Sequence, residues 1–180
     1  MRSLLLWKLK IHWEQRKVNG AIAARYTKLR FDENTHIFVD NEGDVGGAIG
    51  LDNSKLEFGG YVPAYIKVIR NRAQTAGGAI FAQGFIVIIK SHTSLLFSGN
   101  IGYKGGALAL IGNSFIKLKA PINVLFLKNH TEHSGGAIYV KDYRIESFNK
   151  GDLPRCFFSN TRLLPHNVIR FIFRTTFYHT

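Results

Sequence analysis

Gly46-Gly47-Ala48-Ile49 is the first full copy of a four-residue phrase that returns three more times along the chain. The later copies are Gly77-Gly78-Ala79-Ile80, Gly105-Gly106-Ala107-Leu108 and Gly135-Gly136-Ala137-Ile138, and a weaker copy is Asn19-Gly20-Ala21-Ile22. The first glycines of the full copies lie 31, 28 and 30 residues apart. Self-similarity at a near-constant period of this length is typical of stacked repeats, in which each repeat buries its apolar face against its neighbours.

A second phrase, Phe-x-x-Asn, keeps a constant phase with the first. Its apolar members are Phe38, Val68, Phe97, Phe126 and Phe157, and its asparagines are Asn41, Asn71, Asn100, Asn129 and Asn160. Each of the first four asparagines lies five or six residues before a Gly-Gly pair. We expect the apolar members to stack in a core about 4.8 Å apart. We expect the asparagines to stand at corners, because Asn tolerates left-handed backbone geometry, and to form a ladder of hydrogen bonds between repeats.

Each repeat divides into three short strands, and no segment shows a convincing helical period. The position after Gly-Gly-Ala is always apolar, whereas the next position varies through Gly50, Phe81, Ala109 and Tyr139. Successive side chains of a strand point to opposite faces, so the first position is expected to point inward and the second outward. In the second strand, the pairs expected to point inward are Leu29/Phe31, Ile116/Leu118 and Tyr143/Ile145. The Gly-Gly pair is expected at a bend where positive φ and close approach of neighbouring coils exclude a Cβ.

The sequence therefore predicts an all-β parallel solenoid of about five coils with three strands in each coil. Residues 1–18 are expected to be an incomplete first coil or a cap, because the segment from Trp7 to Trp13 alternates strictly between apolar and polar residues. Residues 19–160 carry the repeats, and residues 161–180 form a strand-like cap or tail. The chain has one cysteine, Cys156, so no disulfide within the chain is expected.

The amino terminus begins like a signal peptide, but Lys8 and Lys10 interrupt its apolar run. No apolar stretch reaches the length of about 18 residues expected of a transmembrane helix. The repeat also begins in the middle of a coil. We therefore expect the chain to be a fragment of a longer repeat protein.

The paired phrases resemble the passenger region of the chlamydial polymorphic outer-membrane proteins, and the resemblance covers about residues 19–160. In that family the repeats imply a right-handed parallel β-helix, a location outside the cell or on its surface, and an adhesive role. The resemblance therefore implies a surface scaffold. It names no ligand.

The formal net charge of +12 is unevenly distributed along the chain. Residues 31–57 are acidic, whereas no Asp or Glu occurs between Phe58 and Thr131. A candidate anion-binding face on the outward side of the second strand contains Lys28, Arg30, Lys90, Lys117, Lys119 and Arg144. An acidic glycan or a cell surface is the partner that such a face would favour. The alternative is a solvated face whose lysines discourage aggregation between sheets. We expect no nucleic-acid partner, because no nucleic-acid-binding module is present.

Many β-helix proteins act on polysaccharides, so an enzyme is the first alternative. Glycoside hydrolysis uses two carboxylates that flank one bond, and the central coils contain none. The acids near the amino end are better explained as solvated turns, and they are Asp40, Glu42, Asp44, Asp52 and Glu57. His130 and His133 lie three residues apart without the further ligands that a metal needs. We expect no cofactor and a non-enzymatic binding scaffold. A carbohydrate-active β-helix enzyme and a purely structural fragment stay open as alternatives.

Overall fold

The computed structural model describes residues 4–7, 20–84, 86–90, 92–118, 122–147 and 155–162, and all the elements in these ranges are β-strands. The strands are β1 (Leu4–Trp7), β2 (Ile22–Arg25), β3 (Lys28–Phe31), β4 (Thr35–Val39), β5 (Glu42–Val45), β6 (Ile49–Asp52), β7 (Lys55–Phe58), β8 (Ala64–Ile69), β9 (Arg72–Ala76), β10 (Ile80–Gln83), β11 (Ile86–Ile89), β12 (Thr93–Ser98), β13 (Ile101–Lys104), β14 (Leu108–Leu118), β15 (Ile122–Ser134), β16 (Ile138–Ser147) and β17 (Arg155–Arg162). All pairings between them are parallel.

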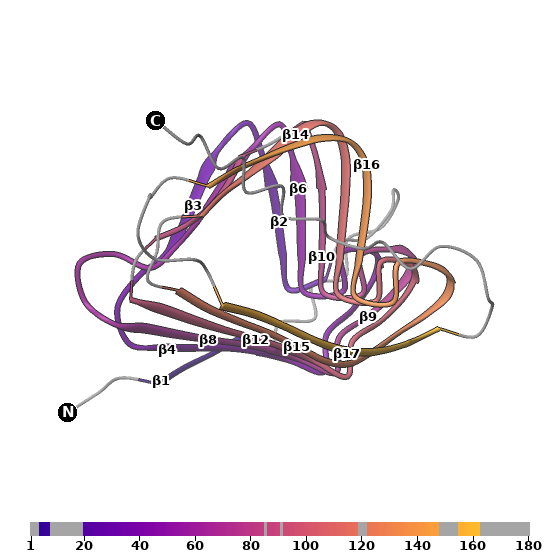
Figure 1. Ribbon diagram of the computed structural model, residues 1–180, viewed down its shortest axis with the longest axis horizontal. Coiled ribbons are helices and arrows are strands. Elements are labelled where there is room, and N and C mark those ends of the chain that lie inside the picture. Colours follow the sequence, from indigo (N-terminus) through magenta and orange to yellow (C-terminus); the bar gives the residue numbers. More distant parts are fainter. Residues whose placement is uncertain are drawn as a thin grey trace, which may run out of the picture.

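The strands wind into a right-handed parallel β-helix, seen nearly end-on in Figure 1. One coil runs through β6, β7, β8 and β9, and the chain then enters β10 beside β6. Strands at equivalent places in successive coils lie side by side, as in the series β4, β8, β12 and β15. This confirms the predicted fold class, although the helix makes about four turns rather than five.

The predicted division of a coil into three strands omits one short strand. A further short strand follows the asparagine in successive coils, as β5, β9 and β13. Its backbone pairs with the neighbouring coils, and the register shifts between Gly102 and Lys104. The strand lacks a clear apolar alternation, which is why the sequence shows only a connection there.

Side chains alternate between the core and the surface as expected in the first strand. Ile49, Ile80, Leu108 and Ile138 lie in one row, and all four pack in or against the core. The next row points outward, yet Ala109 is 0% exposed. Its neighbours in that row are Phe81 and Tyr139, whose larger side chains flank its methyl group. An outward position is therefore not always an exposed one.

In the last coil, the backbone register fixes the rows of the second strand. The backbone register places Ile145 beside Ile116, and Tyr143 beside Ser114. Ser114 and Ile116 lie two residues apart on one face of β14, so this register keeps Tyr143 and Ile145 in rows of the same face, and their inward orientation stays a prediction. The register shifts between Ile111 and Ser114, where β14 holds one residue more than β16.

The row of large apolar side chains runs through Phe38, Val68, Phe97 and Phe126, each at most 2% exposed. The rings of Phe97 and Phe126 stack with their centroids 5.0 Å apart. In the last rung the register places Phe158 beside Phe126 and Phe157 beside Leu125, so the prediction for Phe157 is wrong by one residue. The cause is a shorter corner, because β17 has only Asn160 where β15 has both Lys128 and Asn129.

The two glycines of each pair meet different requirements. The first glycine has a left-handed φ of 64° to 74° in all four coils. The second glycine does not, but it lies against the backbone of the next coil. A Cβ on Gly106 would overlap the carbonyl oxygen of Gly136 and lie 2.6 Å from that of His130. Both predicted requirements are therefore present, but the first glycine meets the positive φ and the second glycine meets the close approach of the next coil.

At the amino end, β1 pairs with β4 and adds one rung to that sheet. The rest of the predicted strand up to Trp13 lies outside the described residues, as does the chain after Arg162. Within the described ranges, no helix is present that could span a membrane.

Candidate functional site

The asparagines form a ladder along the solenoid. Asn41, Asn71, Asn100 and Asn129 are each at most 5% exposed. The side-chain oxygen of Asn71 accepts hydrogen bonds from the backbone N–H of Asn41 at 3.1 Å and from its side-chain amide at 2.8 Å. The same pair of bonds joins Asn71 to Asn100, and Asn100 to Asn129.

Three of the side-chain amides also donate to the preceding coil. Asn71 donates to the carbonyl oxygen of Phe38 at 3.1 Å, and Asn100 donates to that of Val68 at 2.9 Å. Asn129 donates in the same way to Phe97 at 3.0 Å. Because the amides are buried and engaged between coils, the ladder is a structural device and not a ligand site. The sequence Asn129-His130-Thr131 is formally a glycosylation sequon, but we expect it to be unused, because Asn129 is completely buried in the ladder.

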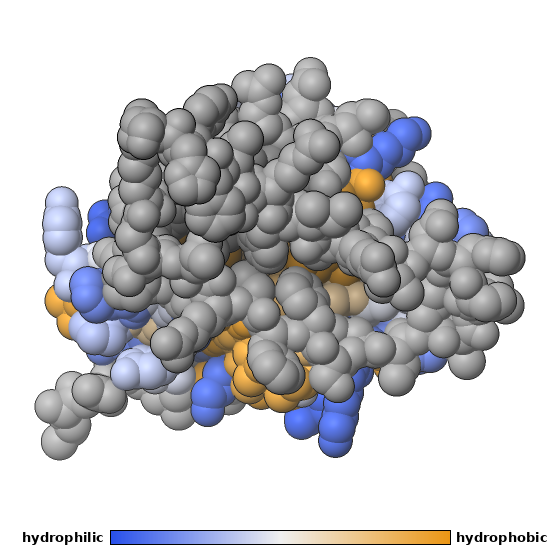
Figure 2. Space-filling model, viewed as in Figure 1, coloured by the Kyte–Doolittle hydropathy of each residue, from blue (hydrophilic) through white to orange (hydrophobic). Residues whose placement is uncertain are grey.

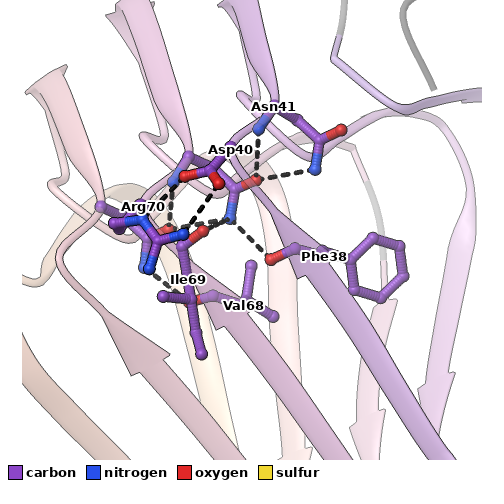
Figure 3. A network of polar contacts seen from close by, with 8 residues as sticks. Phe38, Asp40, Asn41, Val68, Ile69 and Arg70 are labelled. Atoms are coloured by element: carbon purple, nitrogen blue, oxygen red, sulfur yellow. Dashed lines mark hydrogen bonds and ion pairs between the residues drawn. The ribbon is translucent and has the colours of Figure 1, made fainter. Parts of the chain in front are cut away.

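The left-handed residue of this corner is not the asparagine. It is the residue before it, and φ is 54° at Asp40, 51° at Arg70, 63° at Gly99 and 51° at Lys128. The side chains of Asp40 and Arg70 point outward and form two ion-pair contacts of 2.8 Å (Figure 3). The hydrogen bonds and charge of Asp40 raise the pKa of Arg70. The corner thus separates a buried amide ladder from an exposed, charged edge.

The predicted basic face contains an acid at its centre. Glu57 has a side chain only 4% exposed, although it lies outside the apolar core. Its carboxylate oxygens lie 2.7 Å from the Nζ atom of Lys55, 3.1 Å from that of Lys90 and 3.2 Å from that of Lys28. Three lysines and one glutamate leave an excess of positive charge at this place.

Opposing effects set the pKa of Glu57. Burial by itself would raise the pKa, because it disfavours the charged carboxylate. The hydrogen bonds from Lys55, Lys90 and Lys28 outweigh burial and lower the pKa from 4.5 to about 2. Glu57 is therefore a carboxylate near neutral pH, where it holds three side chains from consecutive coils together.

We expect Glu57→Gln to flatten the acid side of the stability profile. The lowered pKa means that Glu57 stabilises the fold above pH 4.5 and loses this contribution as the pH falls towards about 2. Because the lysines are 26% to 53% exposed and recover water, the loss at pH 7 should be only about 1 kcal/mol. Urea melts from pH 7 to pH 2 measure both effects. An unchanged difference between parent and variant at every pH would contradict this linkage.

The other residues of the predicted anion-binding face do not all join this cluster. Arg30 is 2.8 Å from Asp32 and neighbours Glu57 in the register. Lys117 and Arg144 are placed by their backbones alone, at β14 and β16, and Lys119 lies outside the described residues. The predicted row of cations is therefore interrupted by acidic residues, since Arg30 lies beside Glu57 and Lys117 lies beside Glu146. Lys55 follows Lys28 by 27 residues, close to the repeat period, and that spacing is the signal that could have found Lys55 and Glu57.

A protruding loop adjoins these cations. Residues 59–63 connect β7 to β8, two residues more than connect β3 to β4. Tyr61 is 99% exposed at its tip. A Cβ on Gly60 would lie 3.2 Å from the guanidinium of Arg30, so the base of the loop contacts the basic side chains. We call this region the basic corner, and it consists of Lys28, Arg30, Lys55, Glu57, Lys90 and residues 59–63.

No group of three or more metal-ligating side chains occurs in the part of the chain that the structure describes. The ring of His133 stacks on Tyr103 with their centroids 5.1 Å apart. The basic corner is thus the candidate binding site.

The fold and its side-chain ladders define a parallel β-helix repeat protein. Residues 123–141 match the family model for the Chlamydia polymorphic membrane protein repeat. The matched segment contains Phe126, Asn129 and the pair Gly135-Gly136, which are the structural positions of one coil. The chain therefore resembles a polymorphic membrane protein repeat region, as its phrases indicated. The comparisons with curated proteins and with solved structures give no match.

Proposed function

We propose that the chain is a non-enzymatic β-solenoid scaffold of the cell surface or extracellular space, and part of a longer repeat protein. We further propose that it binds an acidic glycan at the basic corner. The surface location is supported by the resemblance to the polymorphic membrane protein repeat. The observation that carries the binding site is the convergence of cations from consecutive coils next to the exposed ring of Tyr61.

The chemistry of the basic corner suits an acidic sugar chain. Lys28 and Lys55 are half-exposed, so their ammonium groups can contact Glu57 and an external anion together. A ring that is 99% exposed offers an apolar face to a sugar ring beside that anion. Because all of these groups lie at the surface, binding should be weakened by salt.

The carboxylates argue against a carbohydrate-active enzyme. Glu57 is held ionised by lysines and is a poor general acid, because its pKa is lowered to about 2. Asp40 and Asp52 are ion-paired with Arg70 and Arg25. A glycosidase requires one carboxyl group with a raised pKa opposite a second carboxylate. These carboxylates do not offer such a pair.

The test is retention on an immobilised sulfated polysaccharide. We expect the double variant with Lys28→Gln and Tyr61→Ser to bind about tenfold more weakly, since it loses one ionic and one aromatic contact. The matched control carries Lys141→Gln and Tyr103→Ser, which remove an exposed lysine of β16 and an exposed tyrosine of β13. Equal losses of binding for both double variants would mean that net charge, and not the basic corner, determines the binding. Release of reducing ends or unsaturated sugars would overturn the non-enzymatic assignment.

A further inference from the structure

The outer surface of one sheet carries an apolar patch that the glycan proposal does not use. The outward positions of β4, β8, β12 and β15 alternate with the buried ones along each strand. The register aligns them into rows across the four strands. We call this surface the outer face, and its outward residues are Thr35, Ile37, Val39, Tyr65, Lys67, Ile69, Ser94, Leu96, Ser98, Asn123, Leu125 and Leu127.

The outer face is unusually apolar for a sheet surface turned away from the core. Half of its residues are aliphatic, and each of these is only half-buried by its neighbours in the sheet. In Figure 1 the four strands lie along the lower side of the solenoid, and no labelled element covers them from outside. Figure 2 shows orange, hydrophobic side chains on that side, flanked by blue, hydrophilic ones. A contiguous apolar patch rimmed by polar residues is typical of an interaction surface.

Lys67 is the one charged residue among the twelve outward residues of the outer face. Lys67 is exposed near its centre, and Lys128 is exposed at its edge. Arg70 lies at the same edge, where it forms an ion pair with Asp40. None of the twelve outward residues is acidic, and β8, β12 and the outer part of β15 belong to the segment without Asp or Glu. The partner that complements this face therefore has an anionic surface layer above an apolar interior.

Two other occupants fit less well. A second copy of the chain would bring its own Lys67 and Lys128 to the same contact, and like charges oppose such a pairing. An acidic glycan would satisfy the lysines, but it would gain little from the aliphatic side chains of Leu96 and Leu125. An anionic lipid surface satisfies both, because acyl chains accept aliphatic side chains and headgroups accept lysines.

We propose that the outer face docks on an anionic lipid surface, with the solenoid axis parallel to the membrane plane. The aliphatic rows enter the boundary between headgroups and acyl chains, and Lys67 and Lys128 contact anionic headgroups. Tyr65 is 40% exposed in the row nearest the loop of residues 59–63, and it suits the interfacial depth that tyrosine prefers. The four strands of the outer face carry none of the basic side chains of the basic corner, so separate variants test the two proposals.

The test is sedimentation of the full chain with phosphatidylcholine vesicles that contain or lack phosphatidylglycerol. We expect binding only when phosphatidylglycerol is present, weakened by salt. Lys67→Glu should weaken it roughly tenfold, because each basic group near an anionic surface contributes substantially. Lys141→Glu makes the same charge change on β16, and it should weaken binding less than about threefold.

A second variant tests the apolar contribution. Leu96→Ser together with Leu125→Ser should reduce vesicle binding and leave retention on the sulfated polysaccharide unchanged, while Lys28→Gln with Tyr61→Ser should do the reverse. A urea melt of the double serine variant verifies that it remains folded. Equal losses from Lys67→Glu and Lys141→Glu would overturn the proposal, as would binding that ignores phosphatidylglycerol. Self-association without vesicle binding would also overturn it, in favour of a second copy.

Discussion

Replacing Gly106 by alanine is expected to lower the free energy of unfolding by about 3 kcal/mol, at the upper end of the range for overpacking. The new methyl group would overlap the carbonyl oxygen of Gly136 and lie 2.8 Å from the backbone nitrogen of His130. These are backbone atoms of the next coil, so no side-chain rotation can relieve the contact. The same region holds the hydrogen bond of 2.8 Å from Ala107 to Ala137 that joins the two coils.

The matched control is Gly99→Asn. Gly99 has a φ of 63°, but the equivalent residues Asp40, Arg70 and Lys128 adopt similar angles without glycine. A Cβ there would meet only the side chain of Arg70, at 3.6 Å. We expect its urea midpoint to stay close to that of the parent. Because each coil contacts only its neighbours, Gly106→Ala should also broaden the transition. Similar midpoints for both variants would mean that close approach at Gly106 is not limiting.

The fold could be predicted because its strictest requirements recur in every coil. A glycine such as Gly106 is needed in every coil where two backbones approach closely. An asparagine such as Asn100 is needed in every coil where a buried side-chain amide bonds to the coil before it and to the coil after it. Each requirement restricts one position to one residue type, so it leaves a periodic trace in the sequence. The left-handed corner left no such trace, because Asp40, Arg70 and Lys128 adopt it as well as Gly99.

The binding surfaces could be predicted only in part, because they depend on register. The alternation placed Lys28 and Arg30 on an outward face, but it did not show that Glu57 occupies the row of Arg30 one coil later. The sequence also did not reveal the register shifts of one residue at β14 and at β17. Extra or missing residues in the corners do not disturb the apolar alternation of the strands. The outer face was missed for a similar reason, since its rows mix Ile37, Lys67 and Leu96.

Removing a rung of the asparagine ladder should have the other large effect. In Asn100→Ala, the backbone N–H and side-chain amide of Asn71 lose acceptors at 3.0 Å, and the carbonyl oxygen of Val68 loses a donor at 2.9 Å. Leaving a buried polar group without its partner costs about 1–3 kcal/mol. With several such groups, we expect a loss of about 3 kcal/mol or more. Ser98→Ala, at a half-buried outward position two residues earlier, should change stability by less than about 0.5 kcal/mol.

Asn100→Asp separates the hydrogen bonds from the volume of the side chain. Its carboxylate could still accept from Asn71, but it could not donate to Val68 and would face the side-chain oxygen of Asn129, which now lies 2.8 Å from the amide of Asn100. Burial raises the pKa of such a carboxyl group. Its protonated form, which can donate, is then favoured in the folded state, so the variant should approach the parent in stability at acid pH and lose stability as the pH rises. Urea melts at several pH values would measure this difference. A pH-independent deficit equal to that of Asn100→Ala would indicate that the ladder acts through packing alone.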